Sequence, residues 1–335
     1  MKIKIFKGHN LYQILIYFLI TEEKERYFLF DDHFNKSFVE KIKKKYLTQE
    51  IEIYRIKSSI FKNFYYFLKR NFNFLKIRKN LKIFEPFEII GNENEVNFLL
   101  KNNSFSLIED GLGTYNYIEE NNKEKYLLLK KLFFKLFRFE IPIINVFDKN
   151  VKKIYLTGLA SIPEEIKDKV EIINLKKLWN KKTEEEKKEI LDIFGFDESI
   201  VSKIKNKKNI LFTQPLSEDG FISEKEKIDL YKNIILNYDK NMLVIKTHPR
   251  EKTNYKNYFP KIEILNQSFP AELFDLLDIK FERVITIFST AALNFSKNSK
   301  VDFYGTRIHP NLLKLWGDSE KIMKANKFLN KDRKI

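Results

Sequence analysis

Short apolar runs alternate with polar stretches of helical pattern along the first half of the chain. Five runs have the length and composition of β-strands, namely Lys2–Phe6, Arg26–Phe30, Glu50–Tyr54, Phe87–Ile90 and Ser106–Glu109. Helical patterns cover Leu11–Ile20, Asn35–Tyr46 and Glu93–Lys101, and two later strand candidates are Tyr155–Ala160 and Val170–Asn174. Strands that alternate with helices predict parallel βαβ units.

A second alternating series follows a charged segment at residues 176–208, which contains the helical pattern KKTEEEKKEILDIF. Its strand candidates are Asn209–Gln214, Met242–Thr247, Arg283–Phe288 and Val301–Tyr304. Helical patterns cover Lys225–Asn237 and Phe269–Leu277, with a further helix start at Ala291–Ser296. We therefore predict an α/β fold of two doubly wound, Rossmann-like domains facing across a cleft, the arrangement called GT-B. The expected boundaries are 1–175 for the first domain, 176–208 for a charged helical linker and 209–335 for the second domain.

Length and composition agree with two folded domains. The chain has 335 residues, which exceeds the size at which one core stops growing, and 43% of them are hydrophobic. It has no cysteine and four histidines, so disulfides and thiolate metal sites are excluded and a histidine-rich metal site is not expected.

The formal net charge of +16 indicates a negatively charged partner. Nucleic acid, an anionic membrane and an anionic substrate are the three options. The sequence has no zinc-finger spacing, no RNP-like aromatic motif and no helix-turn-helix pattern, so we expect no nucleic acid partner.

The first candidate motif is Glu109-Asp110-Gly111, at the end of a predicted strand. Neighbouring side chains on a strand point to opposite faces, so one carboxylate can face a ligand while the other holds the loop. Gly111 lets the backbone turn. The carboxylate that faces the ligand can act as a general base on a hydroxyl group. The alternative is an ordinary acidic turn.

The second candidate motif follows the strand Met242–Thr247. Lys246, His248 and Arg250 supply cations and a proton donor, and Pro249 fixes the turn between them. Such a cluster suits a phosphate, because lysine neutralises its charge and histidine donates a hydrogen bond or a proton. The alternative is a loop histidine beside surface cations, and the dipeptide His309-Pro310 is a weaker candidate of the same kind.

Other strand ends in the second half carry polar residues as well. Ser289 and Thr290 follow a strand at a helix start, where hydroxyls cap the helix and backbone N–H groups attract anions. Glu272 is a candidate for the ribose hydroxyls of a nucleotide, although a first-turn glutamate is also favoured by the helix dipole. Thr213 and Gln214 end another strand in a similar way.

The order of these motifs resembles that of bacterial sialyltransferases, which carry an acidic pair before glycine, a His-Pro motif and a C-terminal Ser/Thr pair. The opening GHNLYQILIY and the length are most similar to glycosyltransferase family 52, which includes lipooligosaccharide and capsule sialyltransferases. The resemblance implies an acceptor-side first domain and a CMP-binding second domain. It also implies an inverting, metal-independent transfer of sialic acid from CMP-sialic acid to a hydroxyl of a galactose- or sialic acid-terminated surface glycan (lipooligosaccharide, capsule or polysialic acid).

The resemblance also implies roles for individual residues. Glu109 is the general base, which Asp110 supports or replaces, and His248 is the general acid or hydrogen-bond donor to the departing CMP. The nucleotide contacts are assigned to Lys246, Glu272, Ser289 and Thr290. No cofactor or metal is expected, because no metal-binding DxD motif stands in a suitable place and Asp31-Asp32-His33 is typical of a solvated turn.

Two basic stretches with apolar residues at helical spacing are Phe61–Phe84 and Lys123–Phe139. Such helices either lie on an anionic membrane or pack in a core or dimer interface. We expect a cytoplasmic protein, since Leu11–Ile20 is too short to span a bilayer and has no signal-peptide cleavage site. Peripheral contact with the inner membrane face and a homodimer are further expectations. The alternatives to sialyl transfer are a GT-B enzyme that uses another nucleotide sugar and a non-catalytic basic protein that binds membranes or polyanions.

Overall fold

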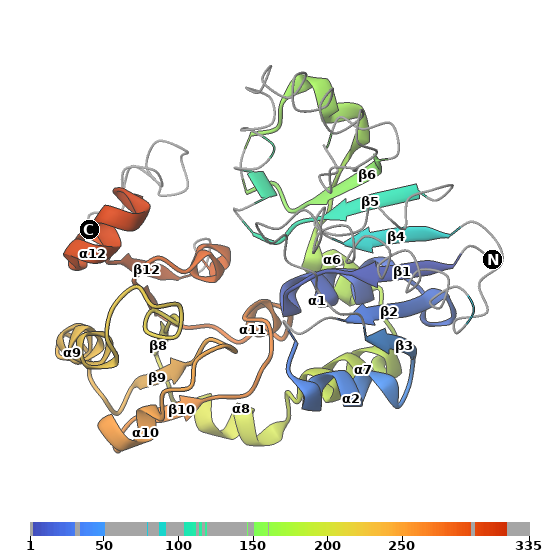
Figure 1. Ribbon diagram of the computed structural model, residues 1–335. Coiled ribbons are helices and arrows are strands. Elements are labelled where there is room, and N and C mark those ends of the chain that lie inside the picture. The colour runs from blue at the N-terminus through green and yellow to red at the C-terminus, as the bar shows by residue number, and fades with distance from the viewer. Residues whose placement is uncertain are drawn as a thin grey trace. The chain divides into compact units, whose positions relative to one another are not determined.

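The chain forms two compact units, Met1–Thr183 (unit 1) and Glu184–Ile335 (unit 2). The computed structural model describes residues 3–30, 34–50, 79, 87–91, 104–111, 114–115, 118, 146, 151–159, 161–295 and 299–319 (Figure 1). The charged segment at 176–208 is divided between the units. Its first helix, α6 (Leu175–Asn180), belongs to unit 1, whereas α7 (Glu184–Phe194) and α8 (Glu198–Ile204) belong to unit 2.

The described part of unit 1 contains a sheet of seven parallel strands in the order β3-β2-β1-β4-β5-β6-β7 (Figure 1). The strands are β1 (Lys4–Lys7), β2 (Arg26–Phe30), β3 (Leu47–Glu50), β4 (Glu88–Gly91), β5 (Ser104–Ile108), β6 (Val151–Leu156) and β7 (Val170–Ile172). Every residue of β5 is buried. Strands inside a parallel sheet are covered on both faces, and β5 accordingly buries its two serines, Ser104 and Ser106, together with its apolar residues.

Helices complete unit 1. α1 (Leu11–Ile20) contacts β4, β5 and α6, and α2 (Lys36–Lys43) contacts β3. Two short 3-10 helices are η1 (Glu23–Glu25) and η3 (Glu164–Lys169). Phenylalanine is common in this core, where the rings of Phe6, Phe28 and Phe30 pack against one another. Tyr17 of α1 packs against Phe6 and Phe28.

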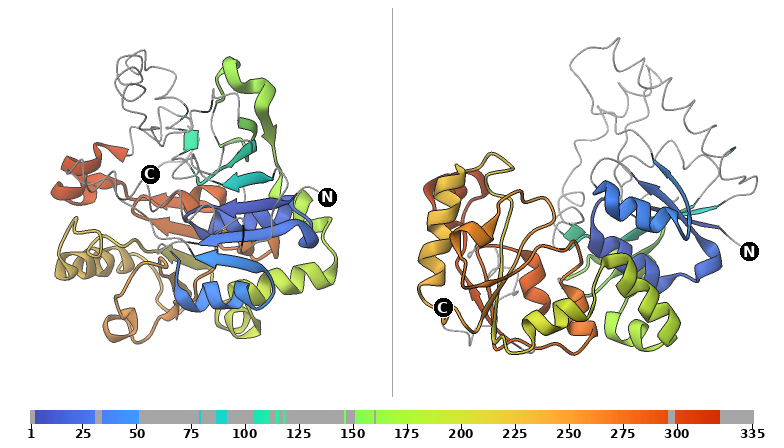
Figure 2. Two further views of the ribbon diagram at one scale, coloured as in Figure 1. Left: turned by 45° about the vertical axis from the view of Figure 1, so that its right-hand side comes forward. Right: turned by 90° about the horizontal axis from the view of Figure 1, so that it is seen from below.

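The described part of unit 2 contains a sheet of five parallel strands in the order β10-β9-β8-β11-β12. These are β8 (Asn209–Phe212), β9 (Leu243–Lys246), β10 (Glu263–Leu265), β11 (Arg283–Thr286) and β12 (Lys300–Phe303). The helix α9 (Glu224–Ile235) lies beside this sheet (Figure 2). Its buried side chains, Tyr231 among them, belong to the same hydrophobic core as those of the strands. The remaining elements are α10 (Tyr255–Tyr258), α11 (Glu272–Leu276), η4 (Thr290–Phe295), η5 (Thr306–Ile308) and α12 (Pro310–Trp316).

Both sheets have a point where the strand order reverses. In unit 1, β1 lies between β2 and β4, and in unit 2, β8 lies between β9 and β11. Ligands of doubly wound sheets bind outside the carboxyl ends of the strands at such points. At the first point Gly91 of β4 is required, because a Cβ there would come within 1.7 Å of the Lys7 carbonyl oxygen of β1.

The predicted α/β class and parallel strands are confirmed, and the edges of the sheets differ from the sequence analysis. The edge strand β3 covers Leu47–Glu50, ahead of the expected Glu50–Tyr54, whose residues from 51 on lie outside the described part. The edge strand β10 was not expected. The predicted helix Glu93–Lys101, the turn Asp31–His33 and the two basic stretches Phe61–Phe84 and Lys123–Phe139 lie outside the described residues, apart from Lys79.

Candidate active site

Two loops meet at the carboxyl end of the sheet in unit 1. Strand β5 ends at Ile108 and leads into Glu109 and Asp110, while β1 leads into His9 and Asn10 at the start of α1. Gln13 of α1 ties the loops together, because its amide donates to the Ile108 carbonyl (3.2 Å) and accepts from the His9 N–H (3.0 Å). The Asn10 side chain donates to the Asp110 carbonyl at 3.4 Å.

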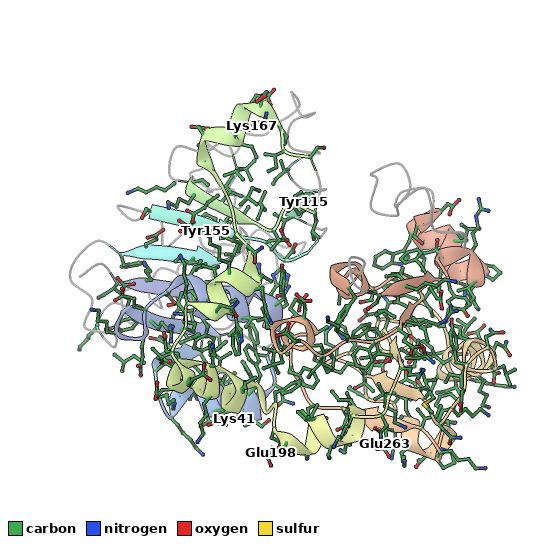
Figure 3. All side chains as sticks on the ribbon, turned by 180° about the vertical axis from the view of Figure 1, so that it is seen from behind. Lys41, Tyr115, Tyr155, Lys167, Glu198 and Glu263 are labelled. Atoms are coloured by element: carbon green, nitrogen blue, oxygen red, sulfur yellow. The ribbon has the colours of Figure 1, made fainter. Side chains whose placement is uncertain are left out.

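Glu109 is fully buried, and within the described residues its carboxylate accepts four hydrogen bonds. Tyr12 OH donates to Oε1 (3.0 Å) and Tyr115 OH to Oε2 (2.8 Å), while Thr157 supplies its backbone N–H and its hydroxyl, each at 2.7 Å. Burial raises the pKa of Glu109, and these donors oppose the rise. Tyr115, labelled in Figure 3, also accepts from the N–H groups of Gly158 and Leu159. Glu109 therefore holds the end of β5 against the loop that follows β6.

Asp110 has a different environment, with 20% of its side chain exposed. Its Oδ1 accepts from the backbone N–H and the hydroxyl of Thr114, at 2.9 and 2.6 Å. Its Oδ2 lies 3.6 Å from Nε2 of His9, whose side chain is 35% exposed. Gly111 follows with φ of 113°, in the region that favours glycine, as the sequence analysis expected of this turn.

The two carboxylates are thus separated by burial and by bonding. Adjacent residues at a strand end point apart, as predicted, with Glu109 inside the fold and Asp110 at its surface. A general base must come within hydrogen-bond reach of an incoming hydroxyl. Asp110 is the more exposed of the two carboxylates and Glu109 is fully buried, and the assignment of the base to either stays a prediction.

In unit 2, His248 lies just after β9 in a tight turn. Its backbone N–H donates to Glu251 Oε2 (2.7 Å), and its Nδ1 accepts from the backbone N–H of Arg250 (3.2 Å). An Nδ1 that accepts must be unprotonated, so the ring proton is on Nε2. Burial, followed by the charges of Arg250 and Lys246, lowers the pKa of His248 to about 4. At neutral pH the ring is an uncharged Nε2–H donor.

Lys246 is buried at the end of β9, and its ammonium donates to the carbonyls of Thr247 and Gln267, both at 3.0 Å. The charge lies 4.4 Å from the centre of the Phe269 ring. Burial lowers the pKa of Lys246 to about 8. These contacts place the side chain inside its own loop, and its contact with a nucleotide stays a prediction.

The other candidates after β9 and those after β8 also contact protein groups. Arg250 forms a two-pronged ion pair with Asp219 at 2.5 and 3.0 Å, and Pro249 beside it is exposed. Thr213 donates to Glu251 at 2.5 Å. The Gln214 side chain accepts from the Phe288 N–H at 3.0 Å and so links the ends of β8 and β11.

The remaining candidates lie after β11 and in α11. Ser289 is half-buried, and its N–H donates to the Thr286 hydroxyl at 2.9 Å. Thr290 begins η4, and its side chain lies outside the described part. Glu272 is the first residue of α11 and is 7% exposed. Parallel register places the ends of β8, β9 and β11 at one edge, so Thr213, His248 and Ser289 lie on the same end of the sheet.

A family model for glycosyltransferase family 52 matches residues 23–312, which include both candidate motifs. The chain belongs to glycosyltransferase family 52. The predicted resemblance is confirmed, and so is the prediction of a glycosyltransferase. An uncharacterized protein of Haemophilus influenzae is 47% identical over 250 residues, which cover 74% of this chain and 78% of that protein.

Solved structures show that this family 52 glycosyltransferase has the predicted GT-B fold. The GT-B domain of the Photobacterium damselae sialyltransferase matches with a TM-score of 0.58 at 12% identity, covering 99% of both chains. A 2,6-sialyltransferase of Photobacterium sp. JT-ISH-224, solved with CMP and lactose, gives 0.64 at 12% identity over 99% of this chain and 77% of that one. An α-2,3-sialyltransferase of Photobacterium phosphoreum gives 0.57 at 13% identity over 99% and 97%.

Several residues of the site in this glycosyltransferase were missed by the sequence analysis. His9, Tyr12 and Thr157 contact the acidic pair from other parts of the chain. Glu251 accepts a hydrogen bond from the backbone N–H of His248. The sequence GHN directly after an apolar strand was the available signal for His9. No local pattern connects Thr157 with Glu109, which are 48 residues apart.

The described residues contain no group of three or more His, Asp or Glu side chains placed to hold a metal ion. None of the described helices of this glycosyltransferase combines the length and the apolar character needed to cross a membrane.

Proposed function

We propose that the chain transfers sialic acid from CMP-sialic acid to a hydroxyl group of a bacterial surface glycan, with inversion and without a metal. The acceptor we propose is a galactose- or sialic acid-terminated lipooligosaccharide, capsule or polysialic acid chain. The observation that carries the proposal is the pair of strand-end groups with complementary chemistry. Asp110 in unit 1 is a partly exposed carboxylate, and His248 in unit 2 is an imidazole whose Nδ1 accepts a hydrogen bond and whose lowered pKa leaves it uncharged at neutral pH.

On the acceptor side, Asp110 takes the proton of the attacking hydroxyl. The oxygen forms its bond to the anomeric carbon while the bond from that carbon to the CMP phosphate oxygen breaks, and attack from the opposite side inverts the configuration. Glu109 keeps Asp110 in place through the strand end that it holds. General base catalysis of this kind contributes roughly 10²- to 10⁴-fold.

On the donor side, the departing CMP carries negative charge on its phosphate. His248 donates a hydrogen bond from Nε2–H to that phosphate, and the hydroxyls of Ser289 and Thr290 donate from the end of β11. The low pKa of His248 favours this role as a neutral donor over that of a charged acid at neutral pH. We assign the ribose hydroxyls to Glu272 and the base side of the nucleotide to the Lys246–Pro249 turn.

The experiment is an assay of CMP release with CMP-sialic acid and lactose or a sialylated acceptor, with the product anomer read by NMR. We expect CMP release that depends on acceptor, an inverted product and equal rates with and without EDTA. Transfer from UDP-sugars alone would assign the chain to another donor. Membrane or polyanion binding without any transfer would support the non-catalytic alternative.

A further inference from the structure

The turn that carries His248 is enclosed by acidic side chains that the proposed chemistry does not use. Glu251 lies three residues after His248, and its side chain is 1% exposed. Its Oε2 accepts from the His248 N–H and from Thr213 Oγ1, at 2.7 and 2.5 Å. Its Oε1 accepts from Tyr255 OH at 2.5 Å. One carboxylate therefore joins the ends of β8 and β9 to α10.

The backbone N–H of His248 can only donate, so it requires an acceptor at Oε2, whereas the hydroxyls of Thr213 and Tyr255 donate in this arrangement and can also accept. Burial raises the pKa of Glu251, and these three donors oppose the rise. A glutamine keeps an oxygen for the His248 N–H only when its NH₂ group turns towards a hydroxyl, and it brings no charge to strengthen the hydrogen bonds.

Behind Glu251 lies Lys227 of α9, whose side chain is completely buried. Its ammonium contacts Glu218 Oε2 at 2.8 Å and Glu224 Oε2 at 3.1 Å, and lies 3.9 Å from Glu251 Oε1. A buried ammonium among carboxylates is held in one place, because each alternative position leaves charge unpaired.

The same acidic residues hold the rest of the turn. Glu218 Oε1 accepts from the Lys252 N–H at 2.7 Å, and Glu224 Oε1 accepts from the Thr253 hydroxyl at 2.7 Å. With the ion pair between Arg250 and Asp219, the backbone from 248 to 253 is fixed at successive points.

We infer that Glu251, supported by Lys227, is a positioning residue that fixes the His248 ring in its Nε2–H form. The link is geometric. The carboxylate holds the His248 N–H, the turn then brings the Arg250 N–H to Nδ1, and the proton is left on Nε2, where the proposed phosphate contact needs it. The expected effect on catalysis rests on the proposed function, whereas the position of the ring proton rests only on the hydrogen bonds of the turn.

The first experiment reads the ring directly. Nitrogen-15 NMR of the full chain labelled at histidine gives four residues to resolve, and His248→Ala assigns the signal of interest. At pH 7 we expect a single Nε2–H form in the natural protein. Glu251→Gln should shift the signal towards a mixture of both forms, and Tyr255→Phe, which removes one donor and keeps the ring, should do so to a smaller extent.

The second experiment is a double-mutant cycle on kcat/KM for CMP-sialic acid. Because hydrogen bonds to charged groups are the strong ones, we expect about a tenfold loss in Glu251→Gln. In the His248→Ala background the same change should cost less than about twofold, since the residue through which it acts is gone. The matched control is Glu263→Gln on the edge strand β10, where Glu263 is labelled in Figure 3. This variant should change neither the NMR signal of His248 nor kcat/KM.

Thermal unfolding shows which variants are folded, and the milder Tyr255→Phe serves if Glu251→Gln is not. An unchanged Nε2–H signal in a folded variant overturns the inference. So does an equal loss of kcat/KM in both backgrounds, which is the result of a general structural role. If the natural protein transfers no sialic acid, the proposed function fails while the NMR measurement still decides the role of Glu251.

Discussion

The carboxyl ends of β5 in unit 1 and β9 in unit 2 are built in the same way. Each has a buried glutamate that accepts only from donors, Glu109 at the first and Glu251 at the second. Each glutamate holds a more exposed neighbour, Asp110 or His248, whose side chain has the chemistry that transfer needs.

The two ends differ in how the buried charge is compensated. Among the described residues, Glu109 contacts hydroxyls and a backbone N–H, whereas Glu251 also lies near the buried cation of Lys227. At the end of β5, Gln13 also holds the strand end, and the donors to Glu109 are neutral. At the end of β9, ion pairs hold the turn that carries His248. Under the proposed function, the buried member of each pair has a structural role and the more exposed member takes part in the chemistry.

The largest expected effect is that of Asp110→Asn, which removes the proposed base and keeps the shape. We expect kcat to fall by about 10³-fold, within the range for general base catalysis, with little change in thermal unfolding. Steady-state kinetics with CMP-sialic acid measure it. A loss of less than about fivefold would move the base role to another group and end the assignment of Asp110.

His248→Ala should have the next largest effect, about 10²-fold on kcat, which is the usual loss for one donor to developing charge. His309→Ala is the matched control, because His309 precedes a proline as His248 does and caps α12 through the Asn311 N–H. We expect it to lower stability slightly and to leave kcat within twofold. Equal losses in both variants would show that the strand end of β9 has no special role.

Glu109→Gln separates structure from chemistry in unit 1. The change removes the charge that strengthens four hydrogen bonds, and the new NH₂ group fits only where a hydroxyl turns to accept, so we expect a loss of about 1–3 kcal/mol in the free energy of unfolding. Activity at a temperature where the variant is folded should fall by about tenfold, less than in Asp110→Asn. Urea unfolding and kinetics on the same samples test this order, and the reverse order would restore Glu109 as the base.

Much of this organisation could be predicted from the sequence, since buried parallel strands such as β8 (NILF) and β9 (LVIK) contain an unbroken apolar run. The edge strands β3 and β10 could not be placed, because they are half exposed and lack such a run, whereas the edge strands β7 and β12 overlap the predicted Val170–Asn174 and Val301–Tyr304. The candidate positions followed from strand ends, but the choice between Glu109 and Asp110 did not. That choice depends on Thr157 and Tyr115, which reach Glu109 through the pairing of β5 with β6 and a loop closure that no local pattern encodes.

The smallest expected effect concerns pH and separates His248 from an ordinary exposed histidine. Its pKa is about 4 in the folded chain and about 6.5 in an unfolded one. Between these values the unfolded state binds more protons than the folded state, so stability rises with pH. The thermal midpoint should therefore fall as pH is lowered from about 6.5 towards 4, and His248→Gln should remove part of that slope.

In the same interval the ring stays uncharged in the folded enzyme, so no change in kcat between pH 5 and 8 should trace to His248. A kcat limb near pH 6.5 that disappears in His248→Gln would instead make His248 a charged acid and end its description as a neutral donor.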